Sequence, residues 1–143
     1  MAGSTSASCI PQLVQNIDYA PTFLELAGVP IPADIQGESL LPLLKGERPE
    51  NWRNSLYYHY YEYPAEHSVK RHYGVRDDRY KLIHFYNDID VWELYDLQED
   101  PHEMNNLYGK PSYEAVMKRM RDELYKLQKQ YDDPVGIRFN VSD

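Results

Sequence analysis

The chain has 143 residues and a mass of 16.9 kDa, enough for one domain with a buried core and too few for a large enzyme. Apolar residues make up 42% and charged residues 27%, which excludes wholesale disorder, and the net charge of −8 argues against a nucleic-acid-binding protein. The single cysteine excludes a disulfide framework and a multi-cysteine zinc site within one chain, and no apolar stretch is long enough to cross a membrane.

The first structured block follows a leader of small residues. Residues 1–12 have neither the basic nor the apolar region of a secretion signal, so we interpret them as a flexible leader or a cloning remnant. Asp18 is predicted to cap a helix that has Pro21 in its first turn and stops at Gly28. The apolar residues of this helix recur at helical spacing: Tyr19, Phe23, Leu26 and Ala27.

A second short helix is predicted between Ser39, which would cap it, and Gly46, which follows its end. Pro42 lies in its first turn, where a missing amide hydrogen is tolerated. Leucines at positions 40, 41, 43 and 44 make this helix apolar nearly all round, so we expect it to be buried against a partner. The polar stretch 47–54 then marks a boundary.

The sequence beyond this boundary changes to the period of two that is typical of β-strands. Asp77 and Asp78 separate two such segments in the arrangement expected of a tight hairpin. The predicted strands cover residues 56–63, 72–76, 79–86 and 91–97.

The C-terminal part predicts a long amphipathic helix that opens with Pro111 and Ser112, which are expected to cap it. The tail 134–143 shows no clear period. The fold class is therefore α+β: a small antiparallel sheet of about four strands packed against a long C-terminal helix, preceded by two short helices. The apolar stripe of the long helix consists of Tyr113, Val116, Met117, Met120, Leu124, Leu127 and Tyr131.

Common catalytic motifs are missing from the sequence. The chain has no phosphate-binding glycine-rich loop, no G-x-S-x-G nucleophile elbow and no H-E-x-x-H zinc motif. Residues 102–106 begin like the zinc motif but end in asparagine. The acidic run around Asp100 offers oxygen atoms for Ca²⁺, yet capping of a turn by Asp100 accounts for it better.

One dense basic stretch interrupts this acidic chain. It contains His67, Lys70, Arg71 and His72, and further basic residues follow. Such side chains bind sulfate, phosphate or carboxylate groups, and arginine can bond two oxygens at once. The alternative is a solvated loop and strand face whose charge is balanced by Glu66, Asp77 and Asp78.

Four segments carry recognisable motifs: residues 17–28, 37–46, 74–83 and 93–107. In this order they resemble the C-terminal region of type I, formylglycine-dependent sulfatases. The first two resemble the end of the catalytic domain, the third resembles the hairpin of the small C-terminal subdomain, and the fourth resembles the turn before its last helix. Residues 61–67 look most like bacterial enzymes related to N-acetylglucosamine-6-sulfatases.

The resemblance implies that residues 13–48 end an alkaline-phosphatase-like catalytic domain and that residues 49–143 form the C-terminal subdomain. The intact enzyme would hydrolyse sulfate esters of sugars, with 6-sulfated N-acetylglucosamine of glycosaminoglycans as the finer expectation. It would use a formylglycine and Ca²⁺ or Mg²⁺, and no cofactor is expected in this chain. The segment Cys9–Leu13 comes nearest to the formylglycine motif, but Leu13 stands where that motif needs arginine. This chain alone is therefore predicted to be inactive.

The resemblance also implies partners. These are the missing catalytic domain and a sulfated sugar, with neither nucleic acid nor membrane, and the expected substrate contacts are His67, Lys70, Arg71 and His72. Without its partner domain, the leucine-rich helix 39–46 is expected to drive self-association. The intact bacterial enzyme is expected in the periplasm or outside the cell. Two alternatives stay open: a stand-alone module that binds anionic sugars, and a fragment of a related phosphoesterase.

Overall fold

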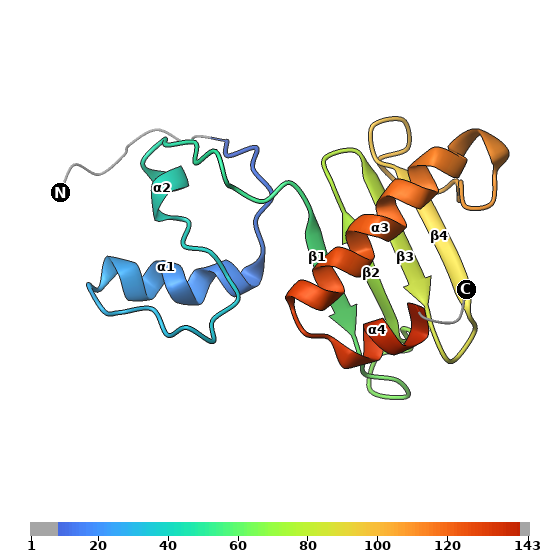
Figure 1. Ribbon diagram of the computed structural model, residues 1–143, viewed down its shortest axis with the longest axis horizontal. Coiled ribbons are helices and arrows are strands. Elements are labelled where there is room, and N and C mark those ends of the chain that lie inside the picture. Colours follow the sequence, from blue (N-terminus) through green and yellow to red (C-terminus); the bar gives the residue numbers. More distant parts are fainter. Residues whose placement is uncertain (1–8, 141–143) are drawn as a thin grey trace. The chain divides into compact units, whose positions relative to one another are not determined.

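A computed structural model of the chain describes residues 9–140 (Figure 1). The chain divides into two compact units, residues 1–54 and residues 55–143, and each is described by itself. Most of the predicted leader, residues 1–8 of 1–12, lies outside the described residues. Between residues 9 and 140, no helix combines the length and the apolar character needed to cross a bilayer.

The N-terminal unit contains a 3₁₀ helix and two α-helices: η1 (Asn16–Asp18), α1 (Tyr19–Leu26) and α2 (Leu41–Leu44). Helix α1 ends as predicted, because Gly28 adopts a φ of +68°, a conformation that glycine reaches without strain. Pro21 and Thr22 are the buried residues of α1. The predicted apolar stripe of this helix is instead exposed within this unit, since Tyr19, Phe23 and Leu26 are each more than half exposed.

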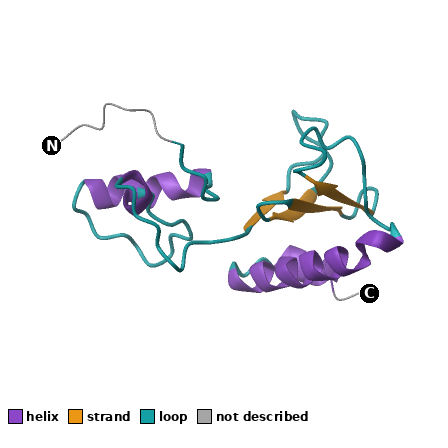
Figure 2. Ribbon diagram, turned by 90° about the horizontal axis from the view of Figure 1, so that it is seen from above, coloured by secondary structure: helices purple, strands orange, loops and turns teal. Residues whose placement is uncertain are grey.

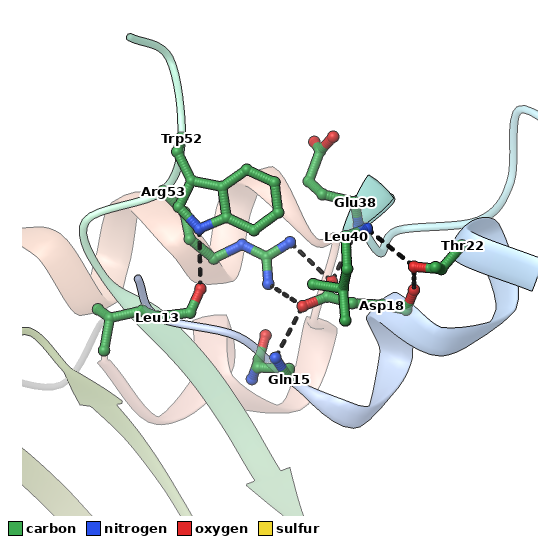
Figure 3. A network of polar contacts seen from close by, with 8 residues as sticks. All are labelled: Leu13, Gln15, Asp18, Thr22, Glu38, Leu40, Trp52 and Arg53. Atoms are coloured by element: carbon green, nitrogen blue, oxygen red, sulfur yellow. Dashed lines mark hydrogen bonds and ion pairs between the residues drawn. The ribbon is translucent and has the colours of Figure 1, made fainter. Parts of the chain in front are cut away.

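Asp18 does not cap α1 as predicted, because its carboxylate is engaged elsewhere. The Asp18 side chain is fully buried, and the guanidinium of Arg53 donates to both its oxygens at 2.6 and 2.8 Å (Figure 3). The backbone N–H groups of Gln15 and Glu38 donate to the same oxygens at 2.7 and 2.9 Å. Burial by itself raises the pKa of Asp18, but these donors outweigh burial and hold the pKa below its ordinary value.

Further hydrogen bonds join the same three segments of the N-terminal unit (Figure 3). The Thr22 hydroxyl donates to the backbone oxygen of Asp18 at 2.5 Å and accepts from the N–H of Leu40 at 2.8 Å. The indole N–H of Trp52 donates to the backbone oxygen of Leu13 at 3.0 Å. A small polar core therefore holds the two helices and the segment around Arg53 together.

Helix α2 lies close to its predicted position but is only partly covered. The Ser39 hydroxyl accepts a hydrogen bond from the N–H of Leu41 at 3.2 Å, although Leu40 is the residue directly before the helix. Leu43 is buried, whereas Leu44 is 56% exposed within this unit. Burial of this helix against a partner domain and self-association through Leu44 both stay predictions.

The C-terminal unit is built on a four-stranded antiparallel sheet in the order β1-β2-β3-β4 (Figure 1). Asp77 closes the β2–β3 hairpin: its N–H donates to the Tyr80 oxygen, and its carboxylate accepts from the N–H groups of Arg79 and Tyr80. The four strands predicted from alternation are all present: β1 (Leu56–Tyr60), β2 (His72–Arg76), β3 (Tyr80–Phe85) and β4 (Val91–Asp96). The first ends three residues before its predicted end.

Two helices lie against one face of this sheet: α3 (Glu114–Gln130) and α4 (Pro134–Asn140) (Figure 2). The first turn before α3 is the 3₁₀ helix η2 (Pro111–Tyr113), so Ser112 lies inside a helix and does not cap one. The predicted α+β fold and the apolar stripe of α3 are confirmed. The core consists of Tyr73, Val75, Leu82, Tyr86, Leu94, Leu107, Met120, Leu124 and Leu127.

Helix α4 is a correction to the sequence analysis, which found no period in the tail. Pro134 is the first residue of this helix, a position where its missing amide hydrogen costs nothing. The Asp133 carboxylate accepts from the N–H groups of Val135 and Gly136 at 3.0 and 3.1 Å. A capping aspartate followed by proline was the available signal for this helix.

On the opposite face of the sheet, the aromatic ring of Tyr58 lies across Gly74 of the neighbouring strand. A Cβ atom at position 74 would lie 2.5 Å from the Tyr58 hydroxyl oxygen and 2.7 Å from the backbone oxygen of Leu82. Only glycine lets the ring approach the backbone this closely. Burial raises the pKa of the Tyr58 phenol well above its ordinary value.

Candidate functional site

One end of the sheet brings together the residues that the sequence analysis selected. The antiparallel order places the end of β1, the start of β2, the end of β3 and the start of β4 side by side. Two connections leave the sheet there, residues 61–71 and residues 86–90 (Figure 1). His67, Lys70 and Arg71 lie in the first connection, and His72 begins β2.

Arg71 shapes the loop 61–71 from within. Its Nε donates to the backbone oxygen of Tyr61 at 3.2 Å, and a terminal nitrogen donates to the backbone oxygen of Tyr63. The other terminal nitrogen lies 3.4 Å from a carboxylate oxygen of Asp88 in the second connection. Because these carbonyls bond to arginine and not to a neighbouring strand, β1 stops at Tyr60.

Lys70 and His67 differ sharply in their surroundings. The Lys70 ammonium lies 3.7 Å from the centroid of the Tyr63 ring and donates to the hydroxyl of the same residue. This is a cation–π contact, which holds the ammonium in a fixed place. The His67 imidazole is exposed and has no hydrogen bond to any of residues 9–140. His67 is therefore available to a ligand, and Lys70 is preorganised beside an aromatic ring.

His72 is held by its first ring nitrogen and by stacking. Nδ1 lies 2.8 Å from the backbone oxygen of Lys70, and because a carbonyl can only accept, Nδ1 carries the proton. The ring stacks on Tyr60, with centroids 5.5 Å apart, and meets Phe85 at 5.1 Å. Nε2 has no partner among the described residues, so His72 can offer this atom to a ligand.

A buried polar cluster lies beneath the same end of the sheet, and sequence reasoning missed it. The Asp133 carboxylate, 5% exposed, accepts from the Tyr57 hydroxyl and from His59 Nδ1 at 2.5 Å. His59 Nε2 then lies 2.6 Å from the hydroxyl of the buried Tyr86. His59 and Asp133 are 74 residues apart, and the sequence carries no pattern that would join them.

The environment of this cluster keeps His59 neutral. Burial lowers the pKa of His59 and outweighs the opposing effect of the Asp133 carboxylate. Burial raises the pKa of Asp133, but the Tyr57 hydroxyl, the Gly136 N–H and His59 outweigh burial and lower it. An ionised Asp133 therefore accepts from a neutral His59, whose Nε2 accepts from Tyr86.

Replacing His59 with glutamine is expected to reduce the acid sensitivity of folding. Because the folded-state pKa of His59 lies below its ordinary value of 6.5, its contribution to stability is complete above pH 6.5 and declines as the pH falls through the folded pKa. Asp133 acts in the same direction only below its ordinary value of 3.8. Denaturant unfolding at pH 7 and pH 5 measures the effect. The natural chain should lose more stability than His59→Gln, and equal losses would contradict the prediction.

A second aspartate–histidine–tyrosine series lies next to the first. His84 Nδ1 is 2.6 Å from the Tyr73 hydroxyl, and His84 Nε2 is 2.8 Å from a carboxylate oxygen of Asp90. The His84 ring stacks on Trp92 with centroids 4.0 Å apart. The second connection is therefore anchored to the sheet through Asp90, and Asp88 in the same connection holds Arg71.

Comparison with known proteins gives a consistent result. A family model described as N-sulphoglucosamine sulphohydrolase, C-terminal, matches residues 3–130. The chain is 58% identical over 134 residues to the N-acetylglucosamine-6-O-sulfatase of Bacteroides thetaiotaomicron, a match that covers 92% of this chain and 23% of that protein.

Solved structures show the same similarity in three dimensions. BT4656, solved in complex with its substrate D-glucosamine-2-N,6-O-disulfate, is 59% identical, with a TM-score of 0.78 over 82% of this chain and 24% of that chain. A phosphonate monoester hydrolase from Silicibacter pomeroyi is 26% identical, with a TM-score of 0.72 over 84% of this chain and 26% of that chain. The chain thus spans about a quarter of the length of each of these proteins.

Proposed function

Because this chain belongs to the N-sulphoglucosamine sulphohydrolase C-terminal family, we propose that it packs beside the catalytic domain of a sulfatase and completes the substrate pocket. The family match confirms the resemblance to sulfatases. We assign residues 13–48 to the end of the catalytic domain and residues 49–143 to the C-terminal subdomain. The intact protein would hydrolyse sulfate esters of sugars in the periplasm or outside the cell.

The proposed substrate is a sugar with 6-sulfated N-acetylglucosamine, as in glycosaminoglycans. The observation that carries this proposal is the 58% identity to an N-acetylglucosamine-6-O-sulfatase across 92% of the chain. The substrate in the BT4656 complex, D-glucosamine-2-N,6-O-disulfate, supports the 6-O-sulfate part of this choice.

We assign substrate binding to His67, Lys70 and Arg71 of the loop 61–71 and to His72, the first residue of β2. His67 and Lys70 supply N–H donors, and when protonated or charged they neutralise a sulfate. His72 follows them in the sequence and can offer its Nε2 atom to the ligand. Arg71 mainly holds the loop in its conformation, because its guanidinium bonds to the backbone oxygens of Tyr61 and Tyr63 and to Asp88.

The residues described here do not fit the cofactors that the resemblance implies. Formylglycine would supply a nucleophilic oxygen, and Ca²⁺ or Mg²⁺ would neutralise sulfate charge. Residues 9–140 contain no group of three His, Cys, Asp or Glu side chains placed to hold a metal ion. Cys9 is exposed and lacks the arginine of the formylglycine motif, since Leu13 stands there. We therefore assign both cofactors to the catalytic part of the intact protein and substrate recognition to this chain.

A titration of the isotopically labelled chain with 6-sulfated N-acetylglucosamine tests the proposed role. NMR shifts should map to the backbone amides of residues 67–72, and the unsulfated sugar should leave them in place. His67→Ala and Lys70→Ala should each weaken binding by about tenfold, the loss expected when one charged hydrogen bond is removed.

Matched variants separate a specific site from general charge. His102→Ala and Lys110→Ala remove exposed side chains of the same types elsewhere in the C-terminal unit, and binding should be unchanged. An equal loss of binding affinity in all four variants would contradict the assignment. So would NMR shifts that occur only at residues other than 61–72.

A phosphoester substrate is the second candidate, because the hydrolase from Silicibacter pomeroyi shares this fold at a TM-score of 0.72. Sulfate and phosphate monoesters carry different charges at neutral pH. The basic loop should therefore bind the two esters with different affinities. Competition between the 6-sulfate and the 6-phosphate of glucosamine decides between them. Stronger binding of the 6-sulfate supports the sulfatase, and stronger binding of the 6-phosphate supports the phosphoesterase.

A further inference from the structure

We propose that Tyr61 is a stacking platform for the sugar ring next to the sulfated one, so that this end of the sheet recognises a sulfated oligosaccharide. The inference rests on the proposed function, because it extends the same site by one sugar unit. It adds a specificity-determining residue that lies outside the basic stretch.

The geometry of Tyr61 is that of a supported aromatic surface. Its ring stacks on His59 with centroids 3.7 Å apart and planes inclined by 24°. Tyr61 is nevertheless 54% exposed, so one ring face is covered by His59 while much of the side chain stays in solvent. Most tyrosines of the C-terminal unit are more buried than this.

The support beneath the ring is rigid. His59 is fixed at both ring nitrogens, by Asp133 at 2.5 Å and by the Tyr86 hydroxyl at 2.6 Å. Arg71 holds the backbone of Tyr61 through its carbonyl oxygen. A ring that is already fixed loses little conformational entropy when a ligand packs on it, so its contact area converts efficiently into affinity.

The surroundings of the ring favour a sugar over an apolar partner. Tyr61 opens the loop that carries His67 and Lys70, and Arg71 links the backbone of Tyr61 to that of Tyr63. The exposed side chains that follow in the loop include Glu62, Glu66 and Ser68. A pyranose has an apolar C–H face and a rim of hydroxyl groups, which matches one open aromatic ring among polar side chains.

The test compares a monosaccharide with a disaccharide on the full chain. The probes are 6-sulfated N-acetylglucosamine, a disaccharide in which this sugar is linked to a uronic acid, and the same disaccharide without sulfate. The natural chain should bind the sulfated disaccharide about tenfold more tightly than the monosaccharide, a gain in the range of one aromatic contact. Tyr61→Ala should abolish this gain and leave monosaccharide binding unchanged.

Three further variants keep the test decisive. Tyr61→Phe preserves the ring and should bind like the natural chain, whereas Tyr61→Leu preserves an apolar contact with His59 but should lose the gain. Tyr19→Ala removes a tyrosine of similar exposure from the N-terminal unit and should change nothing.

The outcomes separate this inference from the proposed function. If Tyr61→Ala still binds the sulfated disaccharide more tightly than the monosaccharide, the stacking role of Tyr61 is wrong. The proposed sulfate site is then unaffected. If the disaccharide binds through Tyr61 with or without sulfate, and the monosaccharide leaves residues 67–72 unchanged, the platform stands and the sulfate assignment is wrong. No binding of any probe at millimolar concentration would overturn both.

Discussion

Replacing Asp133 with alanine is expected to lower the free energy of unfolding of the C-terminal unit by about 4 kcal/mol. Loss of the cap of α4 accounts for about 1–2 kcal/mol. The hydroxyl of Tyr57 and the Nδ1–H of His59 would each lose a buried acceptor, at about 1–3 kcal/mol apiece. Chemical denaturation followed by circular dichroism measures the change.

Asp132 provides the control for this prediction, because it is exposed and lies next to Asp133. Its φ of +49° is a conformation that asparagine tolerates, so Asp132→Asn should leave stability unchanged. A loss below 1 kcal/mol in Asp133→Ala would show that the buried donors find other partners and that the cluster is not a structural anchor.

Replacing Asp18 with alanine is expected to destabilise the N-terminal unit by about 3 kcal/mol, since removing one member of a buried ion pair leaves the other charge uncompensated. The Arg53 side chain is only 12% exposed, and the N–H groups of Gln15 and Glu38 would lose their acceptor as well. Hydrogen exchange at the amides of Gln15, Glu38 and Leu40 should therefore accelerate by about a hundredfold.

Asp34→Ala is the matched change, because Asp34 is an exposed carboxylate of the same unit. Its amide exchange pattern should equal that of the natural chain. If Asp18→Ala also exchanges at the natural rate, the ion pair with Arg53 contributes nothing to holding residues 13–53 together.

The fold was predictable where the signal is local. Alternation located the four strands, Asp77 and Asp78 located the hairpin turn, and the apolar stripe of α3 identified its buried side. Each of these patterns repeats within a few residues and is satisfied by packing against one neighbouring element.

Two of the failures involve partners that are distant in the sequence. Asp18 is of a residue type that often caps helices, but its carboxylate bonds to Arg53, 35 residues later. A guanidinium binds a carboxylate more strongly than helix N–H groups do. Strand β1 ends early because Arg71, from the far end of the loop, takes the oxygens of Tyr61 and Tyr63. Neither contact leaves a periodic trace in the sequence.

For the candidate site, the sequence predicted the basic composition of the loop but not the separate roles of its residues. Clustering of basic residues identified the loop that contains His67, Lys70, Arg71 and His72, but composition assigns all four the same role. The structure distinguishes an exposed imidazole at His67 from a guanidinium at Arg71 that is engaged with backbone oxygens and Asp88. The role of Tyr61 was not predictable from alternation, because its stacking on His59 depends on where β1 ends.

The strand order β1-β2-β3-β4 has a consequence for how the C-terminal unit assembles. Every strand pairs with the strand next to it in sequence, so the sheet closes through short loops and needs no long-range search. As the chain leaves the ribosome, we expect the sheet to pair before α3 is complete. Among the members of the polar cluster, Asp133 is the last to emerge, and until then the Nδ1–H of His59 lacks its carboxylate acceptor. Closure of that polar cluster is therefore expected to follow pairing of the sheet.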